Sequence, residues 1–230
     1  MSKKRTTTKR GAFKTYLPFA IIAAVLLIVL GIGTWLYQSA LHTEGPARAA
    51  LLGAPGATPP RAHGPANAPV TLEEFGDYQC PPCGTLYPEL VKIEAEYGDR
   101  LRLIYRHYPH PTVHPNALLA AHAAEAAGFQ DHFWQMHDQL YRNQTVWSRA
   151  GDPRPLFIEY ARGIGLDADK FVRDMDGAEA DARIVADHER AKSLGIETTP
   201  TILLNGQMLP PATTDLRSAI DEALKTQRQR

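Results

Sequence analysis

Cysteine is the residue type that this chain has least of. Its 230 residues contain two, Cys80 and Cys83, separated by Pro81 and Pro82. No second cysteine pair exists, so a four-cysteine zinc site is excluded and a zinc site would need two histidines. A purely structural disulfide normally closes a longer loop, from which it gains its stabilisation. The cysteine content therefore favours a redox-active dithiol over both alternatives.

An excess of one charge sign is also absent. The chain has 25 basic and 25 acidic residues, so its formal net charge is zero. No basic excess lies outside the N-terminal tail, and nucleic acid is therefore not predicted as a partner. The nine histidines lack the spacing with glutamate that marks a metalloprotease. We expect surface or packing roles for them, and no metal or other cofactor is predicted. The histidines considered are His107, His110, His114, His132 and His137.

A long apolar run near the N-terminus predicts a membrane anchor. Residues 16–38 are uncharged, follow a basic tail at residues 1–15, and exceed the ~20 residues that span a bilayer. The basic flank predicts a cytoplasmic N-terminus. A cleaved signal peptide is the alternative, but its apolar region would be shorter, about 7–15 residues. We expect a single-pass cell-membrane protein whose catalytic domain lies in an extracytoplasmic compartment, where disulfides persist.

Composition divides the remaining chain into a linker and one domain. Glycine, proline and alanine dominate residues 39–67, which predicts a flexible linker. Residues 68–228 are enough for one domain with its own core. No internal repeat is visible in them.

Hydrophobic periodicity within this domain predicts a β-α-β unit, a block of helices and a final β-β-α unit. Asp167 is expected to cap one helix of the block, and Asn205-Gly206 is the pair preferred in a type I′ hairpin turn. This order predicts an α/β, thioredoxin-like fold with a helical insertion at about residues 112–195, preceded by one transmembrane helix. The predicted strands are 70–75, 101–105, 201–204 and 207–209, and the predicted helices are 83–97, 115–127, 131–141, 153–161, 167–175, 178–194 and 214–225.

Three segments carry a family resemblance. Residues 74–83, Glu-Phe-Gly-Asp-Tyr-Gln-Cys-Pro-Pro-Cys, resemble the active-site segment of membrane-anchored, extracytoplasmic DsbA-like thiol-disulfide oxidoreductases. His114-Pro115-Asn116-Ala117 and Thr198-Thr199-Pro200-Thr201 resemble that family too, in matching order and spacing. The resemblance covers residues 66–226. It implies an enzyme that introduces disulfide bonds into exported proteins with free thiols and is re-oxidised by a quinone-linked membrane partner.

The chemistry expected at this site starts from Cys80. As a partly exposed residue at the N-cap of a helix, Cys80 has a thiolate that the helix dipole stabilises. Pro81 and Pro82 then occupy the first two helical positions and lack N–H groups that could stabilise the thiolate. We therefore expect a weaker oxidant than relatives with a Pro-His dipeptide. Cys83 is expected to resolve the mixed disulfide that a substrate forms with Cys80.

The resemblance implies further site residues. It implies a cis peptide bond before Pro200, with Thr199, Pro81 and Pro82 contacting the substrate. It also implies that Glu74 lies below the active site and accepts the proton of Cys83, with a pKa raised by burial. Strand alternation places the neighbouring Glu73 on the opposite face.

Two other functions remain open on the sequence alone. A membrane-tethered reductase for cytochrome or metal-site maturation would use the same dithiol in the opposite direction. A metallochaperone would bind Cu(I) or zinc with Cys80, Cys83 and a histidine. A disulfide isomerase is disfavoured because no separate dimerisation domain is visible.

Overall fold

The computed structural model describes residues 27–28, 30–34, 53–210 and 215–228. The chain divides into two units, Met1–Leu51 and Leu52–Arg230. In the first unit the described residues are helical. Among all the described residues, no helix is both long and apolar enough to cross a bilayer. The tail predicted at residues 1–15 and most of the anchor predicted at residues 16–38 lie outside the described residues.

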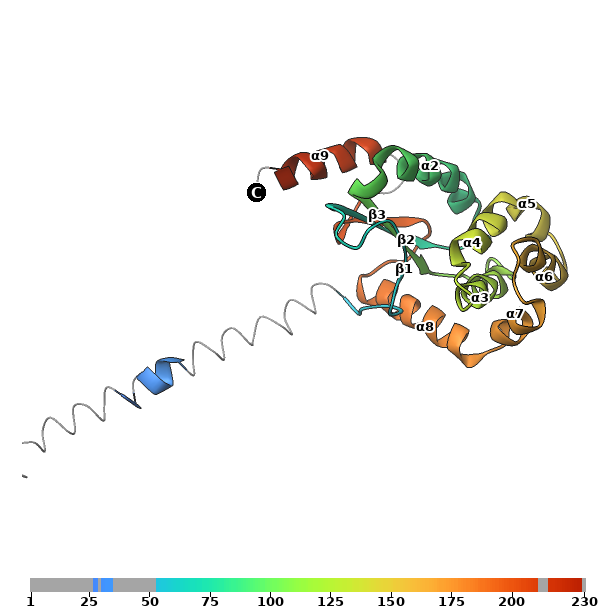
Figure 1. Cartoon of the computed structure of the whole chain (residues 1–230), viewed down its shortest axis with the longest axis horizontal. Coiled ribbons are helices and arrows are strands. Elements are labelled where there is room, and N and C mark those ends of the chain that lie inside the picture. Colours follow the sequence, from blue (N-terminus) through green and yellow to red (C-terminus); the bar gives the residue numbers. More distant parts are fainter. Residues whose placement is uncertain (1–26, 29, 35–52, 211–214, 229–230) are drawn as a thin grey trace, which may run out of the picture. The chain divides into compact units, whose positions relative to one another are not determined.

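A five-stranded mixed sheet forms the centre of the second unit (Figure 1). Its strands lie in the order β1-β3-β2-β4-β5. Strands β2 and β3 are parallel, in register from Val70 opposite Leu101 to Gly76 opposite His107, and every other neighbouring pair is antiparallel. Along the chain, helix α2 lies between the two parallel strands, as the predicted β-α-β unit requires. The strand bounds are β1 Arg61–His63, β2 Val70–Gly76, β3 Leu101–His107, β4 Thr201–Leu204 and β5 Gln207–Met208.

A block of helices separates β3 from β4. Asp167 is the N-cap of α7, and its side chain accepts a hydrogen bond from the backbone N–H of Lys170 at 2.9 Å. The β4–β5 turn has positive φ at both Asn205 (49°) and Gly206 (80°), as a type I′ turn requires. The helix bounds are α2 Pro81–Tyr97, α3 Ala117–Gly128, α4 Phe133–Arg142, α5 Gln144–Trp147, α6 Arg154–Gly163, α7 Ala168–Met175, α8 Ala178–Ser193 and α9 Leu216–Arg228, with a 3₁₀ turn at Gly98–Arg100.

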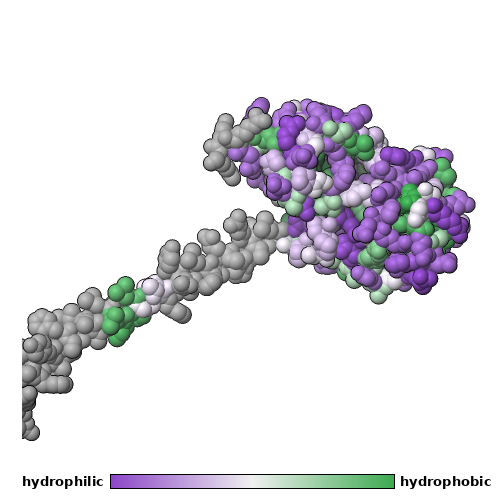
Figure 2. All heavy atoms as spheres, viewed as in Figure 1, coloured by the Kyte–Doolittle hydropathy of each residue, from purple (hydrophilic) through white to green (hydrophobic). Residues whose placement is uncertain are grey.

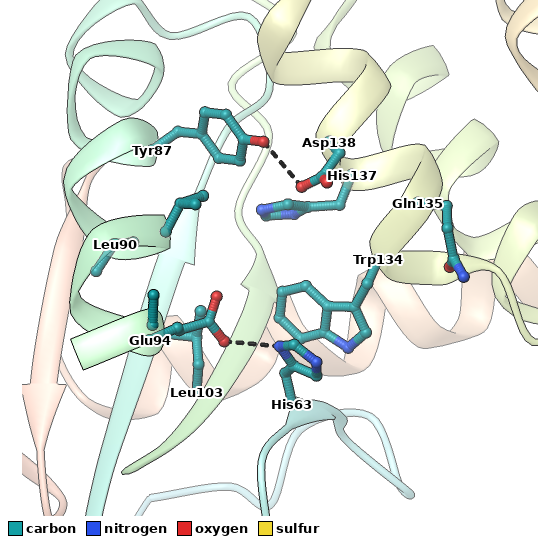
Figure 3. A pocket seen from close by; sticks show the side chains of 11 residues that line it. His63, Tyr87, Leu90, Glu94, Leu103, Trp134, Gln135, His137 and Asp138 are labelled. Atoms are coloured by element: carbon teal, nitrogen blue, oxygen red, sulfur yellow. Dashed lines mark hydrogen bonds and ion pairs between the residues drawn. The ribbon is translucent and has the colours of Figure 1, made fainter. Parts of the chain in front are cut away.

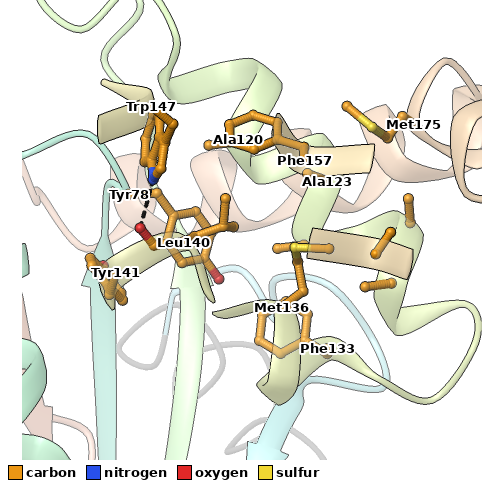
Figure 4. Close-up of a cluster of buried hydrophobic side chains, with 14 of the residues drawn as sticks. Tyr78, Ala120, Ala123, Phe133, Met136, Leu140, Tyr141, Trp147, Phe157 and Met175 are labelled. Atoms are coloured by element: carbon orange, nitrogen blue, oxygen red, sulfur yellow. Dashed lines mark hydrogen bonds between the residues drawn. The ribbon is translucent and has the colours of Figure 1, made fainter. Parts of the chain in front are cut away.

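Helices cover both faces of the sheet. Helices α2 and α9 lie on one face and α8 lies on the other (Figure 1). The first face forms a core in which Leu72 and Leu103 pack with Leu90 of α2 and Ile220 of α9. The helical block has its own core, built around alanines of α3 and larger side chains such as Trp147 (Figure 4). The side of the domain seen in Figure 2 is mainly hydrophilic, with apolar residues in small scattered patches.

The segment predicted as the end of a linker belongs to the domain. Residues 61–63 form β1, which pairs with β3, so the prediction of a flexible linker through residue 67 is wrong at its C-terminal end. Before β1, the N–H of Ala57 donates to Asp187 of α8 at 2.8 Å, and Arg106 of β3 donates to the carbonyl of Ala57 at 2.9 Å. Glycine and proline suit this extended segment, and long-range polar contacts fix it to the sheet and α8.

Glu73 lies on the face opposite to Glu74, as alternation predicts, but that face is buried as well. Its carboxylate accepts hydrogen bonds from Arg106 Nε at 2.7 Å and from Arg190 Nε and Nη2 at 2.8 and 2.7 Å. Arg106 also binds Asp187 at 2.9 Å. Burial alone would raise the pKa of Glu73, but the two guanidinium groups hold it below its ordinary value. We call Glu73, Arg106, Asp187 and Arg190 the charged cluster.

Glu73→Gln is expected to lower the free energy of unfolding by about 3 kcal/mol, because it removes the buried negative charge that pairs with both Arg106 and Arg190. Because the pKa of Glu73 is lowered in the fold, this contribution is present at neutral pH and is lost on acidification. Urea unfolding at pH 7 measures the effect. Glu96→Gln is the matched control, since Glu96 pairs with Arg217 on the surface and should cost at most about 1 kcal/mol. Equal effects of the two variants would contradict the prediction.

Candidate active site

The cysteine pair lies at the turn between β2 and α2. Cys80 is the N-cap of α2, with extended backbone angles, and Pro81 and Pro82 fill the first two helical positions. Both cysteines are free thiols; Cys80 is 4% exposed and Cys83 is fully buried. The expected N-cap position of Cys80 is found, whereas the cysteine is less exposed than the sequence suggested.

The loop before β4 brings Thr199 and Pro200 to the cysteines. The Thr199–Pro200 peptide bond is cis, as the family resemblance implies. The Cys80 Sγ donates to the Thr199 backbone oxygen at 3.4 Å, although the two residues are 119 positions apart. Pro81 and Pro82 are exposed beside this contact, and Thr199 and Pro200 are half-buried. The fold therefore places the backbone of Thr199 against the Cys80 sulfur.

The two thiols differ strongly in acidity. A hydrogen bond from Cys83 lowers the pKa of Cys80 to about 6, against the opposing effect of burial, and a hydrogen bond from the Thr199 side chain adds to the lowering. The pKa of Cys83 is raised well above its ordinary value by burial, by its hydrogen bond to Cys80 and by the negative charge of Glu74. Near neutral pH, Cys80 is therefore the thiolate and Cys83 keeps its proton.

Glu74 is fully enclosed on β2, between Tyr105 of β3 and Ile202 of β4. Burial raises its pKa to about 8, with further raising by the negative charges of Cys80 and Glu94. Its Oε1 atom is buried without a hydrogen-bond partner among the described residues. A carboxyl group of this acidity, whose charge acts on the Cys83 thiol, can take up or release a proton near neutral pH.

Several polar residues that the sequence did not single out hold the turn in place. The Gln144 side chain of α5 donates to the backbone oxygens of Tyr78 and Cys80, both at 2.8 Å. Gly84 permits this approach, because a Cβ there would come within 2.2 Å of the Gln144 side chain. Gln79 accepts from Asn116 N–H at 2.7 Å and donates to the Ser148 carbonyl at 3.0 Å. These partners come from parts of the chain that are far apart in sequence, so their contacts with one another have no local sequence signal.

A separate cavity of about 400 Å³ lies along α2, further from its N-terminus (Figure 3). Two side-chain pairs line it: His63 with Glu94 at 2.9 Å, and Tyr87, which donates to Asp138 at 2.8 Å. The indole of Trp134 lies between α4 and β1, beside the His63 ring. No cysteine lines this cavity. Within the part of the chain that the structure describes, no cluster of three or more histidine, cysteine or acidic side chains could hold a metal ion.

Comparisons with known proteins agree with this geometry. Residues 57–222 match the family described as Thioredoxin. A thioredoxin-like oxidoreductase from Silicibacter pomeroyi DSS-3 superposes with a TM-score of 0.61 at 27% identity, covering 79% of this chain and 97% of its own. Oxidised BdbD from Bacillus subtilis superposes with a TM-score of 0.63 at 24% identity, covering 75% of this chain and 98% of its own.

Curated relatives are much longer proteins. Na(+)/H(+) antiporter NhaA 1 of Salinispora arenicola is 39% identical over 65% of this chain, which spans 22% of that relative. NhaA 3 of Salinispora tropica is 36% identical over 80% of this chain, which spans 30% of it. The matched parts are thus a minor share of each antiporter. The fold, the paired thiols at a helix N-terminus and the family match agree: the chain belongs to the thioredoxin family.

Proposed function

We propose that the protein introduces disulfide bonds into exported proteins from an extracytoplasmic position, tethered to the cell membrane by residues 16–38. The observation that carries the direction of reaction is the position of Cys80 at the N-cap of α2, where hydrogen bonds from Cys83 and from the Thr199 side chain lower its pKa. A stabilised thiolate favours the reduced dithiol, and a pair that favours its reduced form oxidises others.

The exchange proceeds in two displacements. A substrate thiolate attacks the Cys80 sulfur of the disulfide form, the Cys80–Cys83 bond breaks, and Cys83 leaves and takes up a proton. A second substrate thiolate then attacks the substrate sulfur of the mixed disulfide and releases the Cys80 thiolate. The substrate gains a disulfide and the enzyme gains two electrons. Glu74 supplies the proton to Cys83 and accepts it in the reverse step, since its raised pKa lets it hold a proton near neutral pH.

Substrate binding uses the Thr199–Pro200 loop. The backbone of Thr199 already reaches Cys80, so an extended peptide pairing with this backbone would place its own cysteine next to that sulfur. The exposed Pro81 and Pro82 offer contacts on the other side. Many different peptides can pair in this way, because main-chain groups are common to all of them.

The membrane position and the redox partner rest on other observations. The apolar run at residues 16–38 and the basic tail support the anchor. The likeness to parts of proteins named as antiporters supports a place at a membrane. Turnover needs an acceptor for the two electrons, and we propose a quinone-linked membrane protein in that role.

The redox equilibrium of the purified full-length chain with glutathione buffers, measured by thiol alkylation, tests the proposal. A reduction potential of about −180 mV or higher is the expected result for a disulfide donor. Because Pro81 and Pro82 remove two N–H donors near the thiolate, we expect a value below the ≈ −120 mV of the strongest oxidant of this class. A potential near or below about −270 mV would instead assign the protein as an electron-donating reductase.

A further inference from the structure

Asp77 is a buried carboxylate three residues before Cys80, and the exchange steps above give it no role. Its side chain is fully enclosed. Oδ1 accepts from the Gln79 N–H at 2.8 Å, and Oδ2 accepts from the His110 N–H at 3.0 Å and from His114 Nδ1 at 2.8 Å. Because three donors bind this one buried carboxylate, the fold holds it in a defined position and the contacts are not accidental.

These hydrogen bonds join the two loops that frame the cysteines. Gln79 belongs to the turn between β2 and α2, whereas His110 and His114 belong to the loop between β3 and α3. The backbone oxygen of Asp77 accepts from the Cys80 N–H at 3.1 Å. The Asp77 side chain therefore fixes the turn on one side, and the Asp77 backbone oxygen holds Cys80 on the other.

The charge of Asp77 has the same sign as the Cys80 thiolate. Like charges oppose each other more strongly where water is excluded, and Asp77 raises the pKa of Cys80 against the lowering by Cys83. Among the described residues, Glu74 from β2 and Cys83 from α2 also interact electrostatically with Cys80. The side chain that donates to the Asp77 carboxylate, on its far side, is that of His114. The His114 side chain is 20% exposed.

We propose that Asp77, held by His114, is a positioning residue for the Cys80 nucleophile, which fixes the turn that presents the sulfur and opposes the thiolate with a fixed negative charge. The reduction potential of a dithiol rises when its reduced form is stabilised. Asp77 therefore lowers the reduction potential of the Cys80–Cys83 pair. The hydrogen bond from His114 partly compensates the negative charge of Asp77 and so makes this lowering smaller. The inference rests on the proposed function only where it concerns oxidising strength.

Two variants with opposite expected effects test the proposal on the full-length chain. Asp77→Asn removes the charge and keeps the size of the side chain. It should shift the Cys80 thiolate titration, followed by ultraviolet absorbance, to lower pH. It should also shift the glutathione equilibrium about tenfold toward the reduced dithiol, or about 30 mV. His114→Ala removes a donor but keeps the charge, so both quantities should move in the opposite direction. Asp99→Asn, at an exposed site after α2, controls for the loss of one negative charge.

Shifts in the same direction for both variants, or no shift for Asp77→Asn, would overturn the proposal, since a merely structural residue would loosen the turn either way. If Asp77→Asn does not fold, as judged by circular dichroism, the direction of the His114→Ala shift decides. The thiolate titration needs no protein substrate. If the wild-type chain fails to oxidise thiols of an unfolded protein while the titrations shift as expected, the proposed function fails and the role of Asp77 stands.

Discussion

Cys80→Ser is expected to abolish thiol-disulfide exchange, lowering its rate by at least about a thousandfold. The thiolate is the reacting species, and Cys80 has the lowered pKa, about 6. Cys83 cannot replace it, because Cys83 is fully buried and its pKa is raised. Reduction of a protein disulfide by the pre-reduced enzyme in a single turnover measures the rate. The remaining thiol should also resist alkylation at pH 7 in the folded protein.

The second cysteine provides the control for the first. Cys83→Ser keeps the reactive Cys80 thiolate, so attack on a substrate disulfide continues but the mixed disulfide can no longer be resolved from within. A stable covalent complex with the substrate should accumulate, visible as a mass increase that a reductant reverses. Rapid exchange by Cys80→Ser, or trapping by that variant in place of Cys83→Ser, would contradict the assigned roles.

Glu74→Gln is expected to remove a pH dependence of stability. The pKa of Glu74 is about 8 in the fold against an ordinary value of 4.5, so folding disfavours its ionised form. The resulting penalty is absent below pH 4.5, grows as the pH rises and is complete above pH 8. Relative to wild type, the free energy of unfolding of the variant should therefore increase by about 4 kcal/mol between pH 5 and pH 9.

Urea unfolding of both reduced proteins across this range provides the measurement, and both retain Cys80, whose own titration therefore largely cancels. Glu222→Gln, at an exposed position of α9, should leave the profile unchanged. A stability difference that is constant with pH would refute the raised pKa of Glu74. The same variant should slow the attack of Cys83 on a mixed disulfide by about a hundredfold, since Cys83 loses its proton acceptor.

Much of the architecture was predictable because its signals are local. The strand at β2, the cap at Asp167 and the Asn205-Gly206 turn each depend on a few neighbouring residues, and the structure confirms all three. Strand β1 was not predicted, because a strand of three residues is too short to show an alternating hydrophobic pattern. It exists through pairing with β3.

The site was predictable in part for the same reason. The spacing of Cys80 and Cys83 identifies them in the sequence, and the placement of Thr199 followed from a family resemblance. Asp77 and Gln144 act through contacts between segments that only the fold brings together. Glu73 showed a different limit. Alternation gave its face correctly, but α8 buries that face, and pairing with Arg106 and Arg190 makes the burial tolerable.

The charged cluster also determines how the domain responds to a pull on its N-terminal side. Arg190 donates to the carbonyl of Ala54 at 2.6 Å and Arg106 donates to that of Pro55 at 3.2 Å, so the segment entering the domain is fastened to α8 and β3. We expect tension arriving along the chain to be borne there first, on hydrogen bonds from the two guanidinium groups to backbone carbonyls. Helix α2 follows β2 in the chain and is loaded only after these contacts yield. We therefore expect a pull on this segment to reach the geometry around Cys80 only after these hydrogen bonds break.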